Sequence, residues 1–259
     1  MSEGNPFKMD RYDLNARLRP ALLVALPVLL LAAFWLPQVW TLLGGIASLA
    51  ITCGIALLLS KITRFLGRQI ETKLAGRIGR LTTVAALRHA NQRIDPVTKA
   101  RYHNALRASG HIVPTEIEEK ENPDSADTHY SGCASWLLEM TRDKRRFALL
   151  ADENIDYGFR RNLLGLKPVA LTILAGVFIA NALAAVLQWN GFDDTFWKAI
   201  AVSSVCLVSA AVWIWIVTIE FVEDASHAFA ARLLAACDIL HEPVPRSPIS
   251  GAPETAAGH

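Results

Sequence analysis

Residues 20–60 read PALLVALPVLLLAAFWLPQVWTLLGGIASLAITCGIALLLS, without a single Asp, Glu, Lys, Arg or His. One helix needs about 20 apolar residues to cross the hydrocarbon core of a bilayer, so this stretch is long enough to cross twice, with Pro37 ending the first span. The uncharged residues 168–191 and the apolar residues 199–219 supply a third and a fourth span. The sequence therefore predicts an all-α integral membrane protein with four transmembrane helices, arranged as two hairpins, and an α-helical cytoplasmic module.

Lys and Arg are distributed unevenly along the chain. Four precede residue 20, nineteen lie within residues 61–167, one lies between the third and fourth spans, and two follow residue 219. Because loops rich in Lys and Arg stay on the cytoplasmic side, we expect both termini and the polar segment to be cytoplasmic and the two short turns to face outward. Arg17 and Arg19 before an apolar run also resemble a signal peptide. No small-x-small cleavage site follows them, so we expect residues 18–36 to be retained as a span.

These patterns divide the chain into six segments. They are a cytoplasmic N-terminus (1–19), a first transmembrane hairpin (20–60), a cytoplasmic α-helical module (61–167), a second transmembrane hairpin (168–219), a cytoplasmic helical extension (220–241) and a tail (242–259). The tail consists mostly of Pro, Ser, Gly and Ala, a composition that cannot bury a core, so we expect it to be disordered.

The cytoplasmic module contains several helix-start signals. Asp95-Pro96 combines an N-cap residue with proline at the first helical position, and residues 115–118 read as a capping box. Asn122-Pro123 is suited to capping a further helix. We also expect a helix over residues 145–162 and the start of a new helix, the third span, at Pro168.

The second and fourth spans carry no stop signal at their inner ends. Beyond the second span, apolar residues recur at every fourth position while basic residues lie off that stripe: Ile62, Leu66, Ile70, Leu74 and Ile78. Such a helix can lie on anionic lipid or pack as a stalk, and the close approach that Gly67, Gly76 and Gly79 would allow favours packing. The fourth span is expected to continue as a helix into residues 220–241.

The densest positive charge forms the candidate ligand-binding set Arg142, Lys144, Arg145 and Arg146. Arginine forks grip phosphate, so these residues could bind a phosphate-bearing ligand such as a nucleotide messenger. Arg160, Arg161 and Lys167 lie within eight residues of the third span, where contact with lipid headgroups explains them better.

The spans contain no ionisable residue, which argues against a proton- or sodium-coupled transporter. Asn181 is their one strongly polar residue, and small residues recur beside it. Helix packing explains this set better than pore lining does, although a pore formed on assembly stays open. The residues assigned to packing or a pore are Asn181, Gly176, Ala180, Ala184 and Ser203.

No motif in the sequence indicates catalysis or a cofactor. There is no nucleophile elbow, glycine-rich phosphate loop or His-Glu-x-x-His pair, so we expect a protein that is not an enzyme and needs no cofactor. His129 and Cys133 are four residues apart on an expected helix, but two ligands do not make a metal site, and no metal is predicted.

Three stretches resemble a group of uncharacterised bacterial four-span membrane proteins. They are residues 11–20 (RYDLNARLRP), residues 114–116 (PTE) and residues 153–162 (ENIDYGFRRN). The resemblance covers most of the chain and implies a bacterial inner-membrane protein of the kind found among small membrane effectors beside nucleotide-signalling antiviral systems. It implies no established activity and no site residues.

Two functional hypotheses follow. The first is an oligomeric membrane effector or pore, in which the cytoplasmic module senses a nucleotide messenger or protein partner and changes membrane permeability. The second is a non-conducting scaffold that recruits a cytoplasmic partner to the membrane. In both, the partners are the lipid bilayer, further copies of the chain and a cytoplasmic ligand or protein, with no direct contact to nucleic acid.

Overall fold

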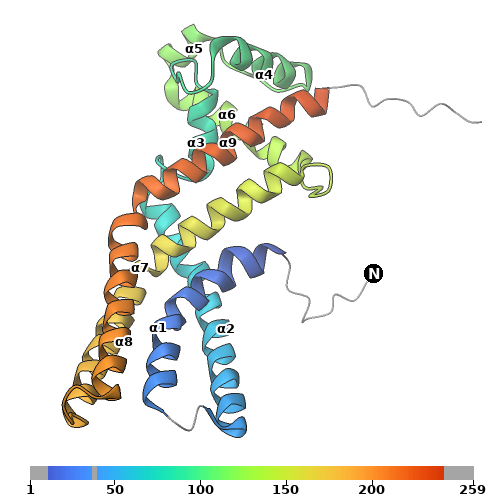
Figure 1. Ribbon diagram of the computed structural model, residues 1–259. Coiled ribbons are helices and arrows are strands. Elements are labelled where there is room, and N and C mark those ends of the chain that lie inside the picture. Colours follow the sequence, from blue (N-terminus) through green and yellow to red (C-terminus); the bar gives the residue numbers. More distant parts are fainter. Residues whose placement is uncertain (1–10, 37–39, 242–259) are drawn as a thin grey trace, which may run out of the picture.

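The computed structural model describes residues 11–36 and 40–241, and Figure 1 shows their arrangement. The chain is 83% helical, and no strand occurs in the described part, which confirms the predicted all-α class. The predicted tail at 242–259, the turn around Gln38 and most of the predicted N-terminal segment lie outside the described residues.

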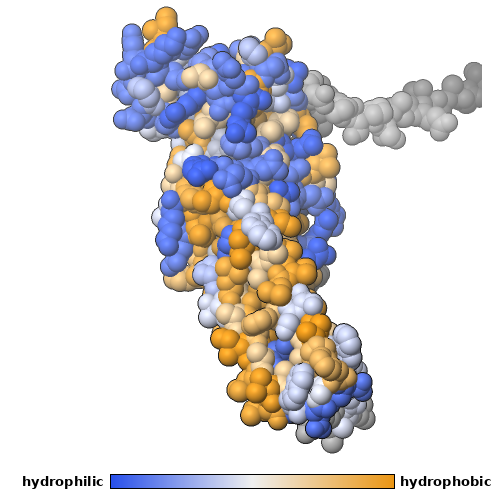
Figure 2. Space-filling view, turned by 60° about the vertical axis from the view of Figure 1, so that its left-hand side comes forward, coloured by the Kyte–Doolittle hydropathy of each residue, from blue (hydrophilic) through white to orange (hydrophobic). Residues whose placement is uncertain are grey.

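The lower half of the molecule in Figure 1 is built from long apolar helices. A π-helix, η1 (Asp13–Leu18), leads into α1 (Arg19–Trp35), and α2 (Leu42–Lys73) follows. The other members are α7 (Ala148–Leu187), α8 (Asp194–Ala211) and a second π-helix, η3 (Val212–Ile216). Four of the resulting helical stretches are long and apolar enough to cross a membrane. Figure 2 shows hydrophobic residues covering most of this half.

The upper half, which we call the head, is largely hydrophilic on the face shown in Figure 2. It consists of α3 (Arg80–Leu87), α4 (Pro96–Ala108), α5 (Glu116–Glu121) and α6 (Pro123–Met140), together with α9 (Ile219–His241). The three helix starts predicted within the head are confirmed. The Asp95 side chain accepts a hydrogen bond from the Thr98 N–H, Thr115 and Glu118 form a capping box, and Asn122 caps α6.

The expected helix start at Pro168 is wrong. α7 is one 40-residue helix that includes Pro168. Proline removes one backbone hydrogen bond and crowds the preceding turn, but neighbouring contacts can outweigh that cost. Here residues 162–166, directly before the proline, are all buried and pack against other helices. Pro168 alone therefore predicts a helix boundary that these tertiary contacts remove.

The expected continuous helix from the fourth span into residues 220–241 is also wrong. The backbone leaves helical geometry at Val217 (ψ 79°), and α9 begins at Ile219. The Lys167 ammonium donates hydrogen bonds to the carbonyls of Ile214 (3.1 Å) and Val217 (2.8 Å). The Thr218 hydroxyl accepts from the Phe221 N–H, as an N-cap residue does. The break is thus stabilised by side chains that satisfy the exposed backbone groups.

The second span continues as a helix as predicted, but only to Lys73, so Ile78 of the predicted stripe lies in the turn after α2. Leu66, Ile70 and Leu74 of the predicted stripe pack against the lower hydrophobic core. Gly76 (φ 95°) and Gly79 (φ 80°) have a different role from the expected one, because both adopt positive φ in the turn after α2.

α2 and α7 cross in close contact at two glycines. A Cβ on Gly165 would lie 2.9 Å from the Gly67 backbone nitrogen, which leaves no space for a side chain. Asn162 lies at the same crossing, fully buried, and its amide donates to the Ala16 carbonyl at 2.6 Å. One turn above, the Arg161 guanidinium pairs with Glu71 of α2 at 2.5 Å. The crossing therefore fixes η1, α2 and α7 together.

Two hydrophobic cores hold the fold. The lower core combines α1, α2, α7, α8, η3 and the start of α9. The core of the head combines α3, α4, α6, the start of α7 and the end of α9, so it includes helix residues that lie outside the 61–167 segment. Phe229 packs against both cores, and its ring stacks on Tyr157 with centroids 6.3 Å apart.

Candidate functional site

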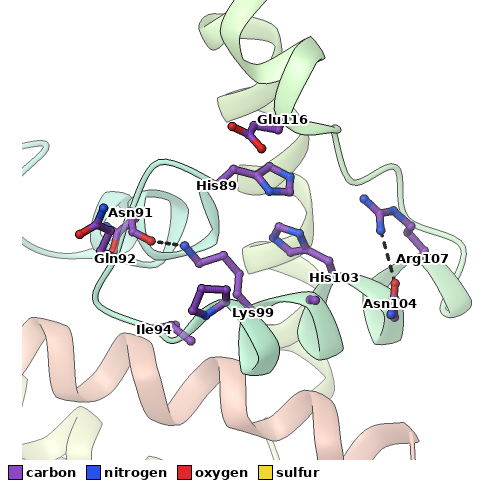
Figure 3. Close-up of a pocket in the computed structure, with 11 residues that line it drawn as sticks. His89, Asn91, Gln92, Ile94, Lys99, His103, Asn104, Arg107 and Glu116 are labelled. Atoms are coloured by element: carbon purple, nitrogen blue, oxygen red, sulfur yellow. Dashed lines mark hydrogen bonds between the residues drawn. The ribbon is translucent and has the colours of Figure 1, made fainter.

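A polar cavity of the head has a volume of about 620 Å³ and lies between the α3–α4 loop, one face of α4 and the start of α5. Figure 3 shows its side chains converging from these three elements. Its lining contains two cationic side chains and one acidic side chain among several amide and imidazole groups: His89, Asn91, Gln92, Ile94, Pro96, Lys99, Ala100, His103, Asn104, Arg107 and Glu116.

Lys99 shapes the loop that forms one wall of this cavity. Its side chain is buried, and the ammonium donates to the carbonyl of Arg88 at 2.8 Å and also to the carbonyl of Asn91. Burial lowers the pKa of Lys99, while the charge of Glu119 acts in the opposite direction. The residue therefore places a positive charge under the cavity and orders the loop at the same time.

Two histidines form the centre of the cavity. The His89 and His103 rings meet edge to face with centroids 4.8 Å apart. His103 Nε2 lies 2.8 Å from the Leu87 carbonyl, and His89 Nε2 lies 3.1 Å from the Pro114 carbonyl. Because a carbonyl only accepts, Nε2 carries the proton in both rings and Nδ1 of a neutral ring is an acceptor. Burial lowers the pKa of His103 to about 4, so this ring is neutral near pH 7.

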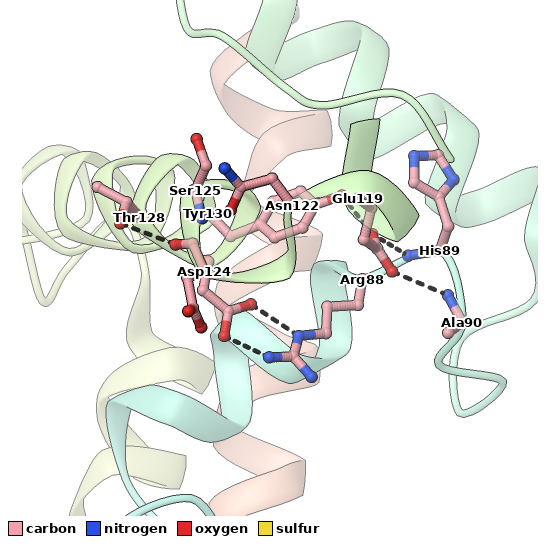
Figure 4. Close-up of polar contacts among 10 residues, drawn as sticks. Arg88, His89, Ala90, Glu119, Asn122, Asp124, Ser125, Thr128 and Tyr130 are labelled. Carbon is pink, nitrogen blue, oxygen red and sulfur yellow. Dashed lines mark hydrogen bonds and ion pairs between the residues drawn. The ribbon is translucent and has the colours of Figure 1, made fainter. Parts of the chain in front are cut away.

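Behind the histidines a buried carboxylate joins three elements (Figure 4). Glu119 of α5 accepts hydrogen bonds from the backbone N–H of His89 (2.8 Å) and Ala90 (3.3 Å) and from the Tyr130 hydroxyl of α6 (2.8 Å). Burial would raise the pKa of Glu119, but these hydrogen bonds outweigh it and hold the pKa below its usual value. Arg88 pairs with Asp127 beside this group, Nε to Oδ1 at 2.7 Å. These contacts fix the α3–α4 loop against α5 and α6.

The charged side chains that line the cavity are mostly positive. Its one acidic residue, Glu116, is already paired with Lys120 at 2.7 Å, whereas Lys99 and Arg107 contribute positive charge. Such a lining favours a small anion with several hydrogen-bonding groups.

The basic set predicted from the sequence does not converge on this cavity. Arg142 pairs with Glu139 at 2.8 Å, and Arg142 and Lys144 line a separate cavity of about 330 Å³ beside α7. Arg146 lines a third cavity, of about 380 Å³, and donates to the Ile239 carbonyl of α9 at 3.3 Å. Arg145 is exposed in the same loop, where its backbone N–H donates to Asp143. The four side chains are thus divided between different surroundings.

Asn181 connects three of the apolar helices. Fully buried on α7, it accepts from the Trp35 indole of α1 at 2.9 Å and donates to the Ala199 carbonyl (2.9 Å) and the Ser203 hydroxyl (3.0 Å) of α8. These are contacts of the interhelical packing type. Gly176 and Ala180 are exposed on α7, and Ala184 is half-buried, so the small-residue stripe is not covered by other helices of this chain.

His129 and Cys133, the two residues at chelating spacing, lie in different surroundings. Cys133 is buried with its sulfur 4.0 Å from the Ile112 carbonyl, while His129 lines a cavity of about 220 Å³. Within residues 11–36 and 40–241, no group of three or more His, Cys, Asp or Glu side chains is placed to hold a metal ion.

Sequence reasoning missed the residues of the 620 Å³ cavity. One signal was available: Lys99, His103 and Arg107 follow at four-residue spacing, so they share one face of the correctly predicted helix α4. His89 and Glu119 carried no comparable signal, because only the tertiary fold brings the α3–α4 loop and α5 to that face.

No family model, curated protein or solved structure matches this chain. Its function is therefore inferred from its own residues.

Proposed function

We propose that the protein is a multipass membrane protein whose cytoplasmic head binds a small anionic signal and transmits binding to the transmembrane helices, changing membrane permeability. The observation that carries this proposal is the position of α4. One face of α4 lines the 620 Å³ cavity, and the same helix pairs with α9 through Arg101 and Asp238, at 2.9 Å. α9 in turn is joined to the fourth apolar helix through the break at Val217.

Exposed tryptophan side chains support membrane insertion. Trp40, Trp189 and Trp197 are exposed at one end of the apolar helices, and Trp215 is exposed at the other. At 1.5 Å per residue, the stretch from Trp197 to Trp215 is about 27 Å long, close to the thickness of a hydrocarbon core of about 30 Å. Trp is enriched at both membrane interfaces, so these residues agree with a bilayer around the lower half.

The excess of Lys and Arg in residues 61–167 supports a head on the cytoplasmic side. Labelling of single cysteines with a membrane-impermeant maleimide on intact cells tests this orientation, in a chain whose native cysteines are replaced by serine. We expect a cysteine at Asn190 to react and a cysteine at Ser109 to stay protected. The reverse pattern would overturn the proposed topology.

A head that relays binding needs firm contacts to the spans. The buried Glu71–Arg161 pair and the Gly67–Gly165 contact join α2 to α7, and α7 itself extends from the head into the apolar half. Residues 20–60 and 168–191 carry no ionisable side chain that could line a pathway for ions within one copy. The proposed pathway therefore forms between several copies of the chain. The exposed Gly176 and Ala180 face offers close helix contact for such an assembly.

Ion flux through purified full-length protein in liposomes tests the effector hypothesis. We expect flux to rise on addition of a bacterial nucleotide extract and the rise to be lost in Arg107→Ala, while the matched variant Arg232→Ala, exposed on α9, keeps it. Liposomes that stay tight under all conditions would overturn the proposal.

One observation favours the alternative of a non-conducting scaffold. Val97, Ile112 and Ile117 on the head are exposed by 80%, 69% and 68%, so each is available for contact with a partner. This alternative is supported if the protein co-purifies with a stable cytoplasmic partner, loses it in the variant Val97→Ser with Ile117→Ser, and shows no conductance.

A further inference from the structure

One exposed face of α2 carries three cations in succession. Lys61, Arg64 and Arg68 are spaced by three and four residues, so they lie on the same side of the helix, and all three are exposed. A different side of α2, which carries Leu59, Thr63 and Gly67, is buried, and it contacts α7 at Gly67. The helix thus buries one face and presents a basic face to the surroundings.

These three cations differ from most arginines of the protein in having no partner. Within the described residues, no ion pair or side-chain hydrogen bond is formed by Lys61, Arg64 or Arg68. By contrast, eight arginines pair with a carboxylate: Arg11, Arg17, Arg77, Arg88, Arg101, Arg142, Arg160 and Arg161. The nearest acidic residue on this side of α2, Glu71, is paired with Arg161 of α7, so it is not a partner of Lys61, Arg64 or Arg68.

The basic face lies at the end of an apolar surface. Leu57, Leu58 and Phe65, on the same part of α2, are exposed by 51%, 64% and 62%. Lys61 is the first charged residue after the uncharged stretch 20–60. The contact between Gly67 and Gly165 places Arg68 at the level of α7 just before Pro168, where the third uncharged stretch begins. Both helices therefore change from apolar to charged at the same height.

We propose that Lys61, Arg64 and Arg68 form a binding site for the phosphate of an anionic phospholipid, whose acyl chains lie along Leu57, Leu58 and Phe65. Two guanidinium groups can each donate two hydrogen bonds to phosphate oxygens, and the ammonium adds a third positive charge. The adjoining apolar side chains favour a lipid over a free phosphate, which would leave them exposed to water. The inference rests on the proposed membrane insertion.

Native mass spectrometry of the full-length protein, released from nanodiscs that contain equal amounts of phosphatidylglycerol and phosphatidylcholine, tests the site. We expect the unaltered protein to retain phosphatidylglycerol in preference. The triple variant Lys61→Gln, Arg64→Gln, Arg68→Gln should lower that preference by about 100-fold, since each of the three cations contributes about one factor of five near an anionic surface. The matched control is Arg93→Gln, Arg145→Gln, Arg232→Gln, which removes the same charge from exposed positions of the head.

Each outcome has a defined meaning. Loss of selectivity in the α2 variant alone supports the site, whereas equal retention of both lipids by the unaltered protein, or equal loss in both triple variants, overturns it. Displacement of the retained lipid by millimolar inorganic phosphate would also overturn it, because the site would then be one for free anions. Resistance of all three proteins to alkaline carbonate extraction shows that the spans insert. A failure of the lipid site is then distinguishable from a failure of membrane insertion, which would release the unaltered protein.

Discussion

Replacing Glu119 by glutamine should loosen the loop that forms the cavity wall. In the native chain Oε2 accepts from the His89 N–H and the Tyr130 hydroxyl, and Oε1 accepts from the Ala90 N–H. A glutamine oxygen in the Oε2 position would keep the first two hydrogen bonds in neutral form, but its amide group would face the Ala90 N–H, donor against donor. The substitution therefore removes a negative charge and one acceptor from a site that is only 8% exposed.

The size of this effect follows from the hydrogen bonds. Bonds to a charged group contribute about 1.5–3 kcal/mol each and neutral bonds about 1, while an unsatisfied buried donor costs about 1–3 kcal/mol. Together these give a loss of about 3 kcal/mol for local opening of the loop. At 1.4 kcal/mol per tenfold, exchange of the His89 and Ala90 amide hydrogens should become about 100-fold faster.

Hydrogen exchange with mass spectrometry on the full-length protein in detergent measures this directly, in a peptide that covers residues 88–91. The matched control is Glu116→Gln in the same helix, whose exposed pair with Lys120 is of the kind that contributes at most about 1 kcal/mol. We expect the control to change exchange of this peptide by less than about threefold. Unchanged exchange in Glu119→Gln, or equal acceleration in both variants, would refute the reasoning.

Three further perturbations test other parts of the fold. The pKa of His103 is lowered from 6.5 to about 4, so as the pH falls the unfolded chain binds this proton before the folded chain does. The folded state therefore loses stability between pH 6.5 and pH 4. In thermal unfolding, His103→Gln should lose up to about 3 kcal/mol less over this pH range than the unaltered protein. Asn181→Leu should destabilise the protein by about 1–3 kcal/mol in detergent unfolding, because three interhelical hydrogen bonds disappear; an unchanged midpoint would contradict its structural role. Gly165→Val should cost about 1–3 kcal/mol through overlap with the Gly67 backbone, whereas Gly176→Ala, with no atom within 4 Å of its Cβ position, should leave the unfolding midpoint within error.

Local signals in the sequence were sufficient for much of the helical structure. N-cap residues such as Asp95 and Asn122 act within three residues of their own position, so their effect does not depend on the rest of the fold. The apolar stretches were equally informative, since length alone sets which helices can cross a bilayer. What these signals share is that the interaction partner lies nearby in the chain.

The misread boundaries and the missed cavity have the opposite property. Pro168 stays inside a helix because contacts with α2, about a hundred residues earlier in sequence, favour the helix around it. The break at Val217 depends on Lys167 of a different helix. The meeting of His89 with His103 depends on Glu119 fixing the loop. Cation density alone predicted a ligand site at residues 142–146, where most of the charge faces solvent or local partners.

Phe229 limits how the protein can be divided for biochemical work. This ring packs against both cores, and α9 also supplies Leu233, Leu234 and Cys237 to the core of the head. A recombinant fragment of residues 61–167 would lack these side chains and expose the hydrophobic surface that they cover. A soluble head therefore requires α9 to be grafted back, for example by a glycine-rich tether from the first turns of α7 to Ile219. We expect a fragment of the head that lacks α9 to aggregate.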